Sequence, residues 1–250
     1  MSTIRLARFL ARAGVASRRG AADLVASGRV AVNGAPPRGP GDPVDPAADR
    51  VTLDGRPLAL AEMVWLALHK PPGYLTSRCG TPRYPSIFSL LESAPEALVA
   101  VGRLDVYTEG LLLCTTDGDA AHRLMNPRWQ VPREYRVEIT GPLGEQARSA
   151  LSRGVAIGDG APVLPGAWRF RAAPRGGGGE LTLVLHEGRS RVVRRLAAAL
   201  GLGVRKLVRT GYGPVALGAL APGGARRLEA RETAALYAAI GLPLPPSLSR

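Results

Sequence analysis

The sequence predicts an α+β protein in which a small N-terminal α/β domain precedes a larger domain built on a mixed, mainly antiparallel sheet. Two short helical patterns and a tight-turned strand segment fill about the first 60 of its 250 residues. Beyond them, strand patterns outnumber helical patterns, and several neighbouring strand patterns are joined by short turns. This arrangement favours antiparallel pairing over a doubly wound parallel sheet.

The first helical pattern covers Arg5–Ala13. Its apolar residues recur with helical spacing on one face, which is typical of a helix packed against a core. The arginines share the other face: Arg5, Arg8 and Arg12. The sequence therefore predicts a helix with a basic outer face.

A second helix is predicted directly after the first, with Ser17 as its cap. Arg18 and Arg19 lie in its first turn, and Gly28 suits the left-handed position just past its end. Gly20 stands where an acidic residue would complete a reciprocal capping box, so this cap is weakened.

Strand patterns follow the two helices. Arg29–Val32 alternates and runs into an Asn33-Gly34 turn, and Val51–Leu53 precedes an Asp54-Gly55 turn. The proline-rich stretch between them, residues 35–48, is predicted as a loop of the same domain. We expect this domain to span residues 1–58, with a linker over residues 59–63.

The larger domain is predicted over residues 64–242, with a loose tail over residues 243–250. Its strand patterns are Val64–Leu68, Leu98–Val101, Leu111–Thr116, Tyr135–Ile139, Leu181–His186 and Leu207–Thr210. Its helical patterns are Asp119–Met125, Leu143–Leu151, Ser190–Leu200 and Arg231–Ile240. The excess of strands over helices again indicates a largely antiparallel sheet.

The charge of the chain indicates a polyanionic partner, and nucleic acid is the obvious candidate. The formal net charge is +13, the pI is near 11.0, and up to Gly34 six arginines stand against one acid, Asp23. Two alternatives remain open. One is a codon bias, which the presence of only two lysines supports, and the other is a helical hairpin with an incidental surplus of arginine.

Several classes of protein are excluded. No stretch approaches the roughly 20 apolar residues of a membrane span, and the N-terminus does not resemble a secretory signal. We therefore expect a cytoplasmic protein. Cys79, Cys114 and three scattered histidines make neither a disulfide framework nor a metal-ligand pattern, so we expect no metal.

The stretch RLARFLARAGVASRRGAADLVASGRVAVNG, residues 5–34, has a known counterpart. It resembles the S4 domain, a small RNA-binding domain first described in a ribosomal small-subunit protein and found again in RNA-modifying enzymes. The resemblance covers about Thr3 to Leu58. It implies that the arginines of this domain bind RNA: Arg5, Arg8, Arg12, Arg18, Arg19 and Arg29.

Four stretches of the larger domain resemble those of bacterial rRNA pseudouridine synthases. They are LHKPPGYLTS (residues 68–77), VGRLDVYTEGLLLCTTDG (101–118), REYRVEITG (133–141) and EGRSRVVRRLAAALG (187–201). The resemblance runs from Thr3 to about Leu236, and the members that modify large-subunit rRNA are the most similar. It implies an isomerase that converts uridine to pseudouridine and needs no cofactor.

Three residues carry the chemistry that this resemblance implies. Asp105 of GRLD is the catalytic residue, Arg194 pairs with it, and Tyr135 packs on the flipped base. By residue type alone, Asp105 could be a turn former, Tyr135 a core residue and Arg194 a phosphate contact. The carboxylate could act as a nucleophile at the sugar or at the ring, or help to extract a proton.

Further residues near these motifs are expected to bind RNA or to support the site: Lys70, Arg103, Thr108, Arg191 and Arg195. On a helix that begins at Ser190, the arginines Arg191, Arg194 and Arg195 share one face that looks into the cleft. Lys70 in the KPPG turn is expected to support the structure first and to contact phosphate second.

We therefore expect an rRNA pseudouridine synthase that acts as a monomer, most readily on 23S rRNA, free or in an assembly intermediate. Two alternatives stay open: a non-catalytic rRNA-binding or ribosome-assembly protein of the same fold, and the same enzyme acting on 16S rRNA. An acid in a basic cleft favours the enzyme, because binding alone would not require it.

Overall fold

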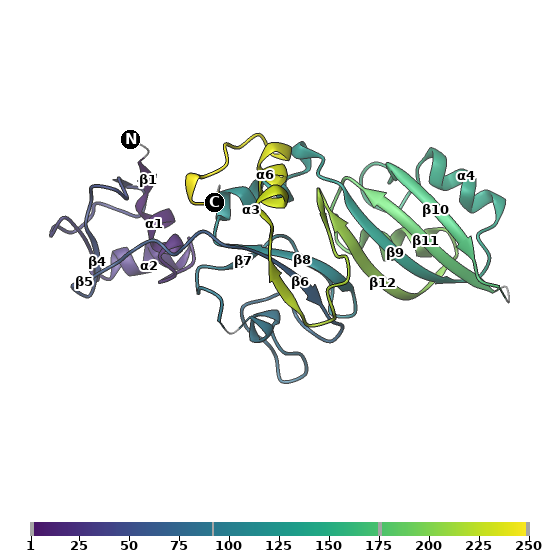
Figure 1. The fold of residues 1–250 in the computed structure, drawn as a ribbon, viewed down its shortest axis with the longest axis horizontal. Helices are drawn as coiled ribbons and strands as arrows, with labels where there is room; N and C mark the ends of the chain where they lie inside the picture. Colours follow the sequence, from purple (N-terminus) through teal and green to yellow (C-terminus); the bar gives the residue numbers. More distant parts are fainter. Residues whose placement is uncertain (1–2, 92, 175–176, 249–250) are drawn as a thin grey trace. The chain divides into compact units, whose positions relative to one another are not determined.

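The computed structural model describes residues 3–91, 93–174 and 177–248, which form two compact units (Figure 1). The N-terminal unit comprises the described residues through Val64, together with Ser93–Val99 and Thr115–Gly118. The large unit comprises Trp65 to Leu91, Ala100–Cys114 and the described residues from Asp119 onward. Two short segments from later in the chain thus belong to the N-terminal unit.

The N-terminal unit is built from short elements. They are β1 (Ile4–Arg5), α1 (Leu6–Arg12), α2 (Gly20–Ala26), β2 (Val30–Val32), β3 (Pro43–Val44), β4 (Val51–Leu53) and β5 (Arg56–Pro57). Strand β1 pairs with β3, and β2, β4 and β5 form an antiparallel sheet. The apolar faces of both helices and of these strands share one core, in which Leu6 and Leu10 are fully buried. The amphipathic pattern of the first helix is therefore confirmed.

The turns and caps of this unit follow the sequence closely. Asn33 and Gly34 have φ values of 52° and 81°, and Asp54 and Gly55 have 52° and 79°, so each pair provides the two positive φ angles of a type I′ turn. Helix α2 begins at Gly20, later than predicted, yet the Ser17 hydroxyl still accepts a hydrogen bond from the Gly20 amide at 3.0 Å.

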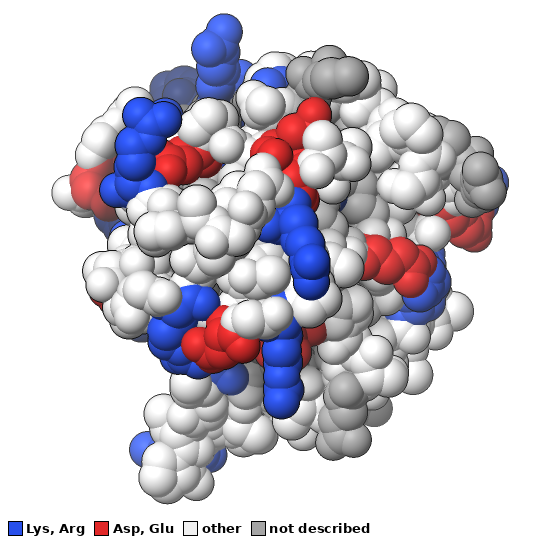
Figure 2. Space-filling view, turned by 90° about the vertical axis from the view of Figure 1, so that its left-hand side faces the viewer, with Lys and Arg blue, Asp and Glu red and all other residues white. Residues whose placement is uncertain are grey.

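One face of the protein carries both signs of charge. Figure 2 views the molecule from the side on which β4 and β5 lie, and shows basic and acidic side chains interspersed among uncharged ones. In the N-terminal unit an ion pair joins the residue before β2 to the turn after β4: the Arg29 guanidinium lies on the Asp54 carboxylate, with Nη2 to Oδ2 at 2.5 Å. This pairing holds the pKa of Asp54 below its usual value.

From Trp65 onward the chain forms a nine-stranded sheet with helices packed against it. Its strands are β6 (Trp65–Lys70), β7 (Val99–Ala100), β8 (Glu109–Thr115), β9 (Arg133–Thr140), β10 (Ala167–Ala172), β11 (Gly178–Leu185), β12 (Gly203–Tyr212), β13 (Val215–Ala216) and β14 (Ala225–Arg227). Its α-helices are α3 (Gly118–Met125), α4 (Glu145–Arg153), α5 (Val192–Ala199) and α6 (Ala230–Ala239). Short 3-10 turns lie at η1 (Ile87–Leu90), η2 (Pro127–Trp129) and η3 (Pro246–Leu248).

The sheet has the strand order β10-β11-β9-β12-β8-β6-β14, with β7 and β13 pairing off this path. Strand β12 runs parallel to β8, whereas β10, β11, β9 and β12 pair antiparallel in succession and β14 is antiparallel to β6. The predicted mixed, mainly antiparallel α+β fold is therefore confirmed.

Two hydrophobic cores flank the sheet of the large unit. One lies on β9, β11 and β12 beneath α4 and α5, and the other lies on β6 and β8 beneath α3 and α6. Leu111 and Leu113 of β8 belong to the second core, and together with Leu112 they are 0 % exposed, so both faces of this strand are covered. Three consecutive leucines are the sequence pattern of such a central strand.

Gly110 of β8 lies against the neighbouring strand. Its φ is +106°, and a Cβ at this position would lie 2.3 Å from the Arg209 carbonyl oxygen and 2.6 Å from the Arg209 amide nitrogen. Only glycine fits such an approach. This contact explains the glycine of the TEGLLL stretch.

The structure differs from the sequence prediction at the C-terminus and at the sheet edge. In the predicted loose tail, Leu244 and Leu248 pack against the second core, so the described part of the tail is docked, while residues 249 and 250 lie outside the described residues. Strand β10 was not predicted, because its residues are mostly exposed and alternate around only two large apolar side chains, Trp168 and Phe170.

Candidate active site

A cavity of about 960 Å³ opens in the large unit where loops meet the sheet. Its walls come from residues 75–77, from the loop of residues 100–108 that precedes β8, and from residues 188–194 around the start of α5. Its floor comes from β9 and β12. All four motifs that the sequence singled out in the larger domain therefore contribute residues to one cavity.

Asp105 lies in the loop before β8, and its exposed side chain lines the cavity. The loop turns tightly here, because the Thr108 amide donates a hydrogen bond to the Asp105 carbonyl at 3.0 Å. Arg103, also exposed, lines the same wall. Thr108 is 3 % exposed, so its side chain packs inside the loop.

Lys70 holds this loop from the inside. The side chain is 0 % exposed, and its Nζ donates hydrogen bonds of 3.0 Å to the carbonyls of Pro71, Val106 and Thr108. Burial lowers the pKa of Lys70 to about 8, against the opposing influence of the Asp105 and Glu109 charges. Of the two roles that the sequence suggested for Lys70, the geometry supports loop support and leaves no donor for a phosphate.

Three further hydrogen bonds fix the same loop. The Gly73 amide donates to the Val106 carbonyl at 2.8 Å, from a turn in which Gly73 adopts φ +83°. Thr76 Oγ1 donates to the Leu104 carbonyl at 3.0 Å and accepts from the Leu104 amide at 3.2 Å. The KPPGYLTS stretch therefore holds Leu104 and Val106, the residues on either side of Asp105, by hydrogen bonds.

The floor of the cavity is made by side chains of one sheet face: Arg133 and Tyr135 of β9, and Arg209 and Tyr212 of β12. Arg209 pairs with Tyr135, and Tyr212 pairs with Arg133. Residues 209 and 212 of a regular strand would point to opposite faces, but a register shift between Arg209 and Gly211 brings them to the same one. Tyr135 is 7 % exposed, so it combines a core position with a place in the cavity wall.

Two buried arginines enclose the Tyr212 ring. The guanidinium carbons of Arg133 and Arg209 lie 5.1 Å and 5.0 Å from its centroid. Arg133 Nη2 donates to the Tyr212 hydroxyl at 3.1 Å, and Arg209 Nε donates to the Leu111 carbonyl at 2.7 Å. Neither arginine was predicted as a site residue, since the bulge that turns Tyr212 beside them leaves no periodic signal in the sequence.

Helix α5 brings Arg194 to the cavity, but not into an ion pair with Asp105. Among the described residues no basic nitrogen lies within 4 Å of the Asp105 carboxylate, and Arg194 Nη2 donates instead to the Tyr107 carbonyl at 3.4 Å. The predicted direct pairing is therefore not formed here. Both groups line the same cavity, and the carbonyl that holds Arg194 belongs to the loop that carries Asp105.

The start of α5 also differs from the prediction. The helix begins at Val192, and Arg191 precedes it in a left-handed conformation with φ +52°, so Arg191 is not on the helical face of Arg194. Arg191 is exposed and lines the cavity. Arg195 turns to Asp159, with Nη1 to Oδ2 at 2.9 Å, and to the Ile157 carbonyl, so this guanidinium fastens a neighbouring loop.

Comparison with known proteins shows the family of the chain. The model of a family described as RNA pseudouridylate synthase matches residues 64–199, more than half of the chain. The chain belongs to this family. It is therefore an RNA pseudouridine synthase, an isomerase, and the model of the S4 domain matches its residues 4–51.

Relatives resemble this synthase over nearly all of its length. An RNA pseudouridine synthase of Aquifex aeolicus is 38% identical over 100% of both chains. The ribosomal large subunit pseudouridine synthase B of Salmonella typhimurium is 38% identical over 96% of this chain and 84% of its own. A crystal structure of a pseudouridylate synthase, 29% identical, superposes with a TM-score of 0.64 over 93% of this chain and 99% of its own.

The predicted RNA-binding arginines of the synthase's N-terminal unit fall into different environments. Arg5, Arg18 and Arg19 are exposed, and Arg8 and Arg12 are half-buried. Arg29 is engaged by Asp54. Arg29 is also exposed, but its pairing with Asp54 connects two strands.

No group of three or more histidine, cysteine or acidic side chains among the described residues is arranged to hold a metal ion. Within the same residues, no helix is long and apolar enough to span a bilayer.

Proposed function

We propose that this synthase isomerises a uridine of 23S rRNA to pseudouridine through Asp105. The observation that carries the proposal is the charge of the cavity lining, in which Asp105 is the one carboxylate among the described residues. Six arginines share that lining: Arg103, Arg133, Arg189, Arg191, Arg194 and Arg209. A cavity that only gripped RNA phosphates would gain nothing from this acid.

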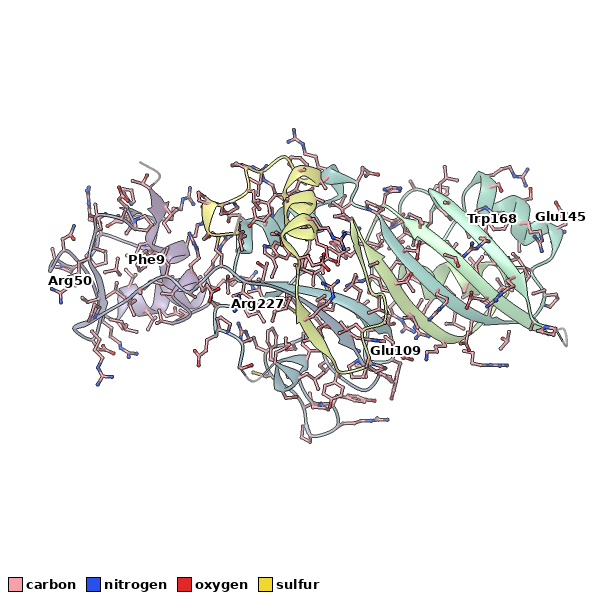
Figure 3. All side chains as sticks on the ribbon, viewed as in Figure 1. Phe9, Arg50, Glu109, Glu145, Trp168 and Arg227 are labelled. Carbon is pink, nitrogen blue, oxygen red and sulfur yellow. The ribbon has the colours of Figure 1, made fainter. Side chains whose placement is uncertain are left out.

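The nearest other acid of the motif is already engaged. Glu109, labelled in Figure 3, begins β8, and its Oε2 lies 3.3 Å from Lys206 Nζ. It does not line the cavity. Asp105 therefore remains as the carboxylate available for chemistry at an entering nucleoside.

The reaction requires no added atoms. The bond from the ribose C1′ to the uracil N1 breaks, the ring turns, and C1′ joins C5, while the C5 proton leaves and N1 gains one. An ionised carboxylate can act as the nucleophile at the sugar or at the ring, or assist in removing the proton. The uridine must leave its stack to reach Asp105, and the lining has an aromatic floor at Tyr135 to receive a flipped base.

Arg194 is proposed to complete the site when RNA enters. Its guanidinium makes a long hydrogen bond of 3.4 Å to the Tyr107 carbonyl, which belongs to the loop that carries Asp105. An arginine suits this role because it stays protonated and can bind a carboxylate through two parallel hydrogen bonds.

The large-subunit substrate rests on the Salmonella relative, whose name states that it acts on the ribosomal large subunit. We further propose that the synthase acts as a monomer in the cytoplasm, where rRNA is made and assembled in bacteria. The S4 domain supports RNA binding by the N-terminal unit.

Substitution of Asp105 tests the proposal. Asp105→Asn keeps the shape of the side chain and removes its charge, so we expect no pseudouridine in protein-free 23S rRNA fragments and RNA affinity within about threefold of wild type. Mapping of pseudouridines by reverse-transcription stops after carbodiimide treatment gives the first readout, and filter binding gives the second.

A comparable loss of RNA binding in Asp105→Asn would instead mean that Asp105 is structural. Wild-type protein that modifies 16S but not 23S fragments would refute the proposed substrate. Absence of product on both, with RNA binding intact, would indicate a binding protein rather than an enzyme.

A further inference from the structure

Two tyrosines bridge the loop of Asp105 to a basic arm, defined here as residues 77–86. The Tyr84 hydroxyl, in the arm, lies 2.7 Å from the Tyr107 hydroxyl, and the two rings meet edge to face with centroids 6.1 Å apart. Tyr107 lies two residues after Asp105, which limits the separation of their Cα atoms to about 7 Å. The bridge therefore stands at the lip of the cavity.

Tyr107 is far more exposed than the other tyrosines of the cavity lining. Its side chain is 59 % exposed although it lines the cavity, whereas the other tyrosines of the lining, Tyr135 and Tyr212, are 7 % and 1 % exposed. Its hydroxyl bond to Tyr84 fixes the ring. The result is an aromatic face held in place and open to solvent, which is the form of a stacking platform.

The arm is an ordered loop. Its base is closed by the Leu75 amide, which donates to the Pro85 carbonyl at 2.9 Å, and by the Leu75 carbonyl, which accepts from the Ile87 amide at 2.9 Å. Ser86 Oγ donates to the Ser77 carbonyl at 2.5 Å. An arm fixed in this way loses little conformational entropy when it binds a partner.

The charge of the arm favours a polyanion over a protein partner. No acidic residue occurs between Lys70 and Leu91, while Arg78 and Arg83 lie in the arm. Both guanidinium groups stack on aromatic rings, Arg78 over Phe88 at 4.3 Å and Arg83 over Tyr84 at 5.2 Å. Cations interleaved with aromatic faces are the recognition surface of single-stranded nucleic acid.

We propose that Tyr107, braced by Tyr84, stacks against an unpaired nucleotide next to the target uridine, while the arginines of the arm contact the neighbouring backbone. The inference rests on the proposed function, because it places the target at Asp105. A base stacked at the lip would hold open the gap from which the uridine has left, and would favour targets in loops or bulges over targets in paired RNA.

The first test uses a seven-nucleotide RNA, six uridines with 2-aminopurine at the centre, and measures both binding by anisotropy and stacking by fluorescence quenching. A stacked base contributes about 1–3 kcal/mol, so Tyr107→Ala should weaken binding by about 5-fold or more and abolish the quench. Tyr107→Phe keeps the ring and should bind within about threefold of wild type with the quench retained.

Leu164→Ala is the matched control, since Leu164 is also 59 % exposed but does not line the cavity. It should leave affinity and quench unchanged. Equal affinity and equal quench in wild type and Tyr107→Ala would overturn the proposal, as would a loss of quench in Tyr107→Phe as large as that in Tyr107→Ala.

Cys79 offers a second test without altering the sequence. It is exposed in the arm, whereas Cys114 is buried and burial raises the pKa of its thiol to about 12, so a thiol-directed photocrosslinker should label Cys79 alone. Ultraviolet crosslinking to the same RNA is expected, and its complete absence would contradict the placement of RNA on the arm.

Neither readout depends on turnover. A synthase that shows the quench and the crosslink but forms no pseudouridine would refute the proposed function while leaving the stacking site intact. A synthase that forms pseudouridine but shows neither signal would refute the stacking site alone.

Discussion

Lys70 shows how one buried charge can position the loop of a cavity-lining carboxylate, Asp105, through backbone carbonyls. Its three hydrogen bonds end on carbonyls, two of which, Val106 and Thr108, belong to the loop of Asp105. Charge-assisted bonds of this kind contribute about 1.5–3 kcal/mol each, but taking the ammonium out of water costs free energy of similar size. The net contribution of Lys70 is therefore to the shape of the loop more than to the stability of the fold.

Replacing Lys70 with methionine separates these two effects. Lys70→Met leaves the loop carbonyls without their donor, so we expect kcat for pseudouridine formation to fall at least tenfold, with a modest change in stability of about 1–3 kcal/mol at pH 7. Lys70→Arg serves as the control with a retained charge in a longer, planar group.

The difference in stability between wild type and Lys70→Met is expected to depend on pH. Because the pKa of Lys70 is lower in the folded protein, about 8, than its ordinary value of 10.5, the unfolded chain binds more protons between these values. Wild-type stability relative to Lys70→Met should therefore rise as pH increases from about 8 to 10.5, by at most about 3 kcal/mol. Urea denaturation at pH 7.5 and pH 10 measures this difference, and a flat or falling difference would contradict the burial of a charged Lys70.

At the scale of elements, the contact between β8 and β12 decides where the cavity floor lies. Gly110 allows the Arg209 backbone to approach, and the register shift just after Arg209 then turns Tyr212 toward the cavity. The pairing of β8 with β12 therefore aligns the loop with the cavity floor. Asp105 lies just before β8, and Arg209 lies within β12.

Gly110→Ala should destabilise the protein by more than about 3 kcal/mol, because the added methyl group meets backbone atoms that cannot move aside cheaply. Gly141→Ala is the matched control: Gly141 also has positive φ, +87°, but nothing lies within 4 Å of an added Cβ. This control should lose only about 1 kcal/mol from backbone strain. Equal losses in chemical denaturation would show that the strand approach is not tight.

The sequence predicted the elements of this fold better than the groups of its site. Periodicity located β8 and β9, because a strand that is covered on both faces or alternates in burial leaves a direct record in residue type. It could not locate β10, whose surface is mostly exposed, nor the register shift in β12 that brings Tyr212 beside Arg133. The motif singled out Asp105, which the structure places in the cavity lining, whereas the buried Arg209 of the same lining was missed because its place there depends on pairing between distant strands.

Arg191 and Arg194, which lie on either side of the start of α5, illustrate the same limit of sequence-based prediction. Helical spacing placed Arg191 and Arg194 on one face, but the backbone at Arg191 is left-handed, so the helix begins after it. Such a conformation costs a non-glycine residue about 1 kcal/mol and is not encoded in hydrophobic periodicity.

At the scale of the whole molecule, the arginines behind the net charge of +13 differ in their surroundings, because acids engage some of them. Arg5 and Arg19 of the N-terminal unit are exposed, whereas Arg29 and Arg195 are held by Asp54 and Asp159. The count of 33 lysines and arginines therefore overstates the number of groups that are ready to displace counterions from RNA, whereas the net charge already subtracts the acids that pair with them.

Salt dependence of RNA binding tests this distinction. Each phosphate contact contributes about 0.7–0.9 to the slope of log affinity against log salt, so the double variant Arg5→Gln with Arg19→Gln should reduce the slope by about 1.5. Arg29→Gln, the control, should change it by less than about 0.4. Filter binding to a 23S rRNA fragment between 50 and 300 mM salt gives the slopes, and a larger effect of Arg29→Gln would contradict the role given to its pairing with Asp54.

The three enclosed leucines of β8 have a consequence for motion. Backbone amides in a strand covered on both faces exchange their hydrogens mainly when the surrounding structure opens, so we expect β8 to be among the slowest-exchanging strands in a hydrogen-exchange measurement. The loop that bears Asp105 leads directly into that strand, and Lys70 holds it through hydrogen bonds to the carbonyls of Val106 and Thr108. Under the proposed function, the carboxylate is therefore held stiffly, and the adjustment needed to bring uridine and carboxylate together falls on the RNA.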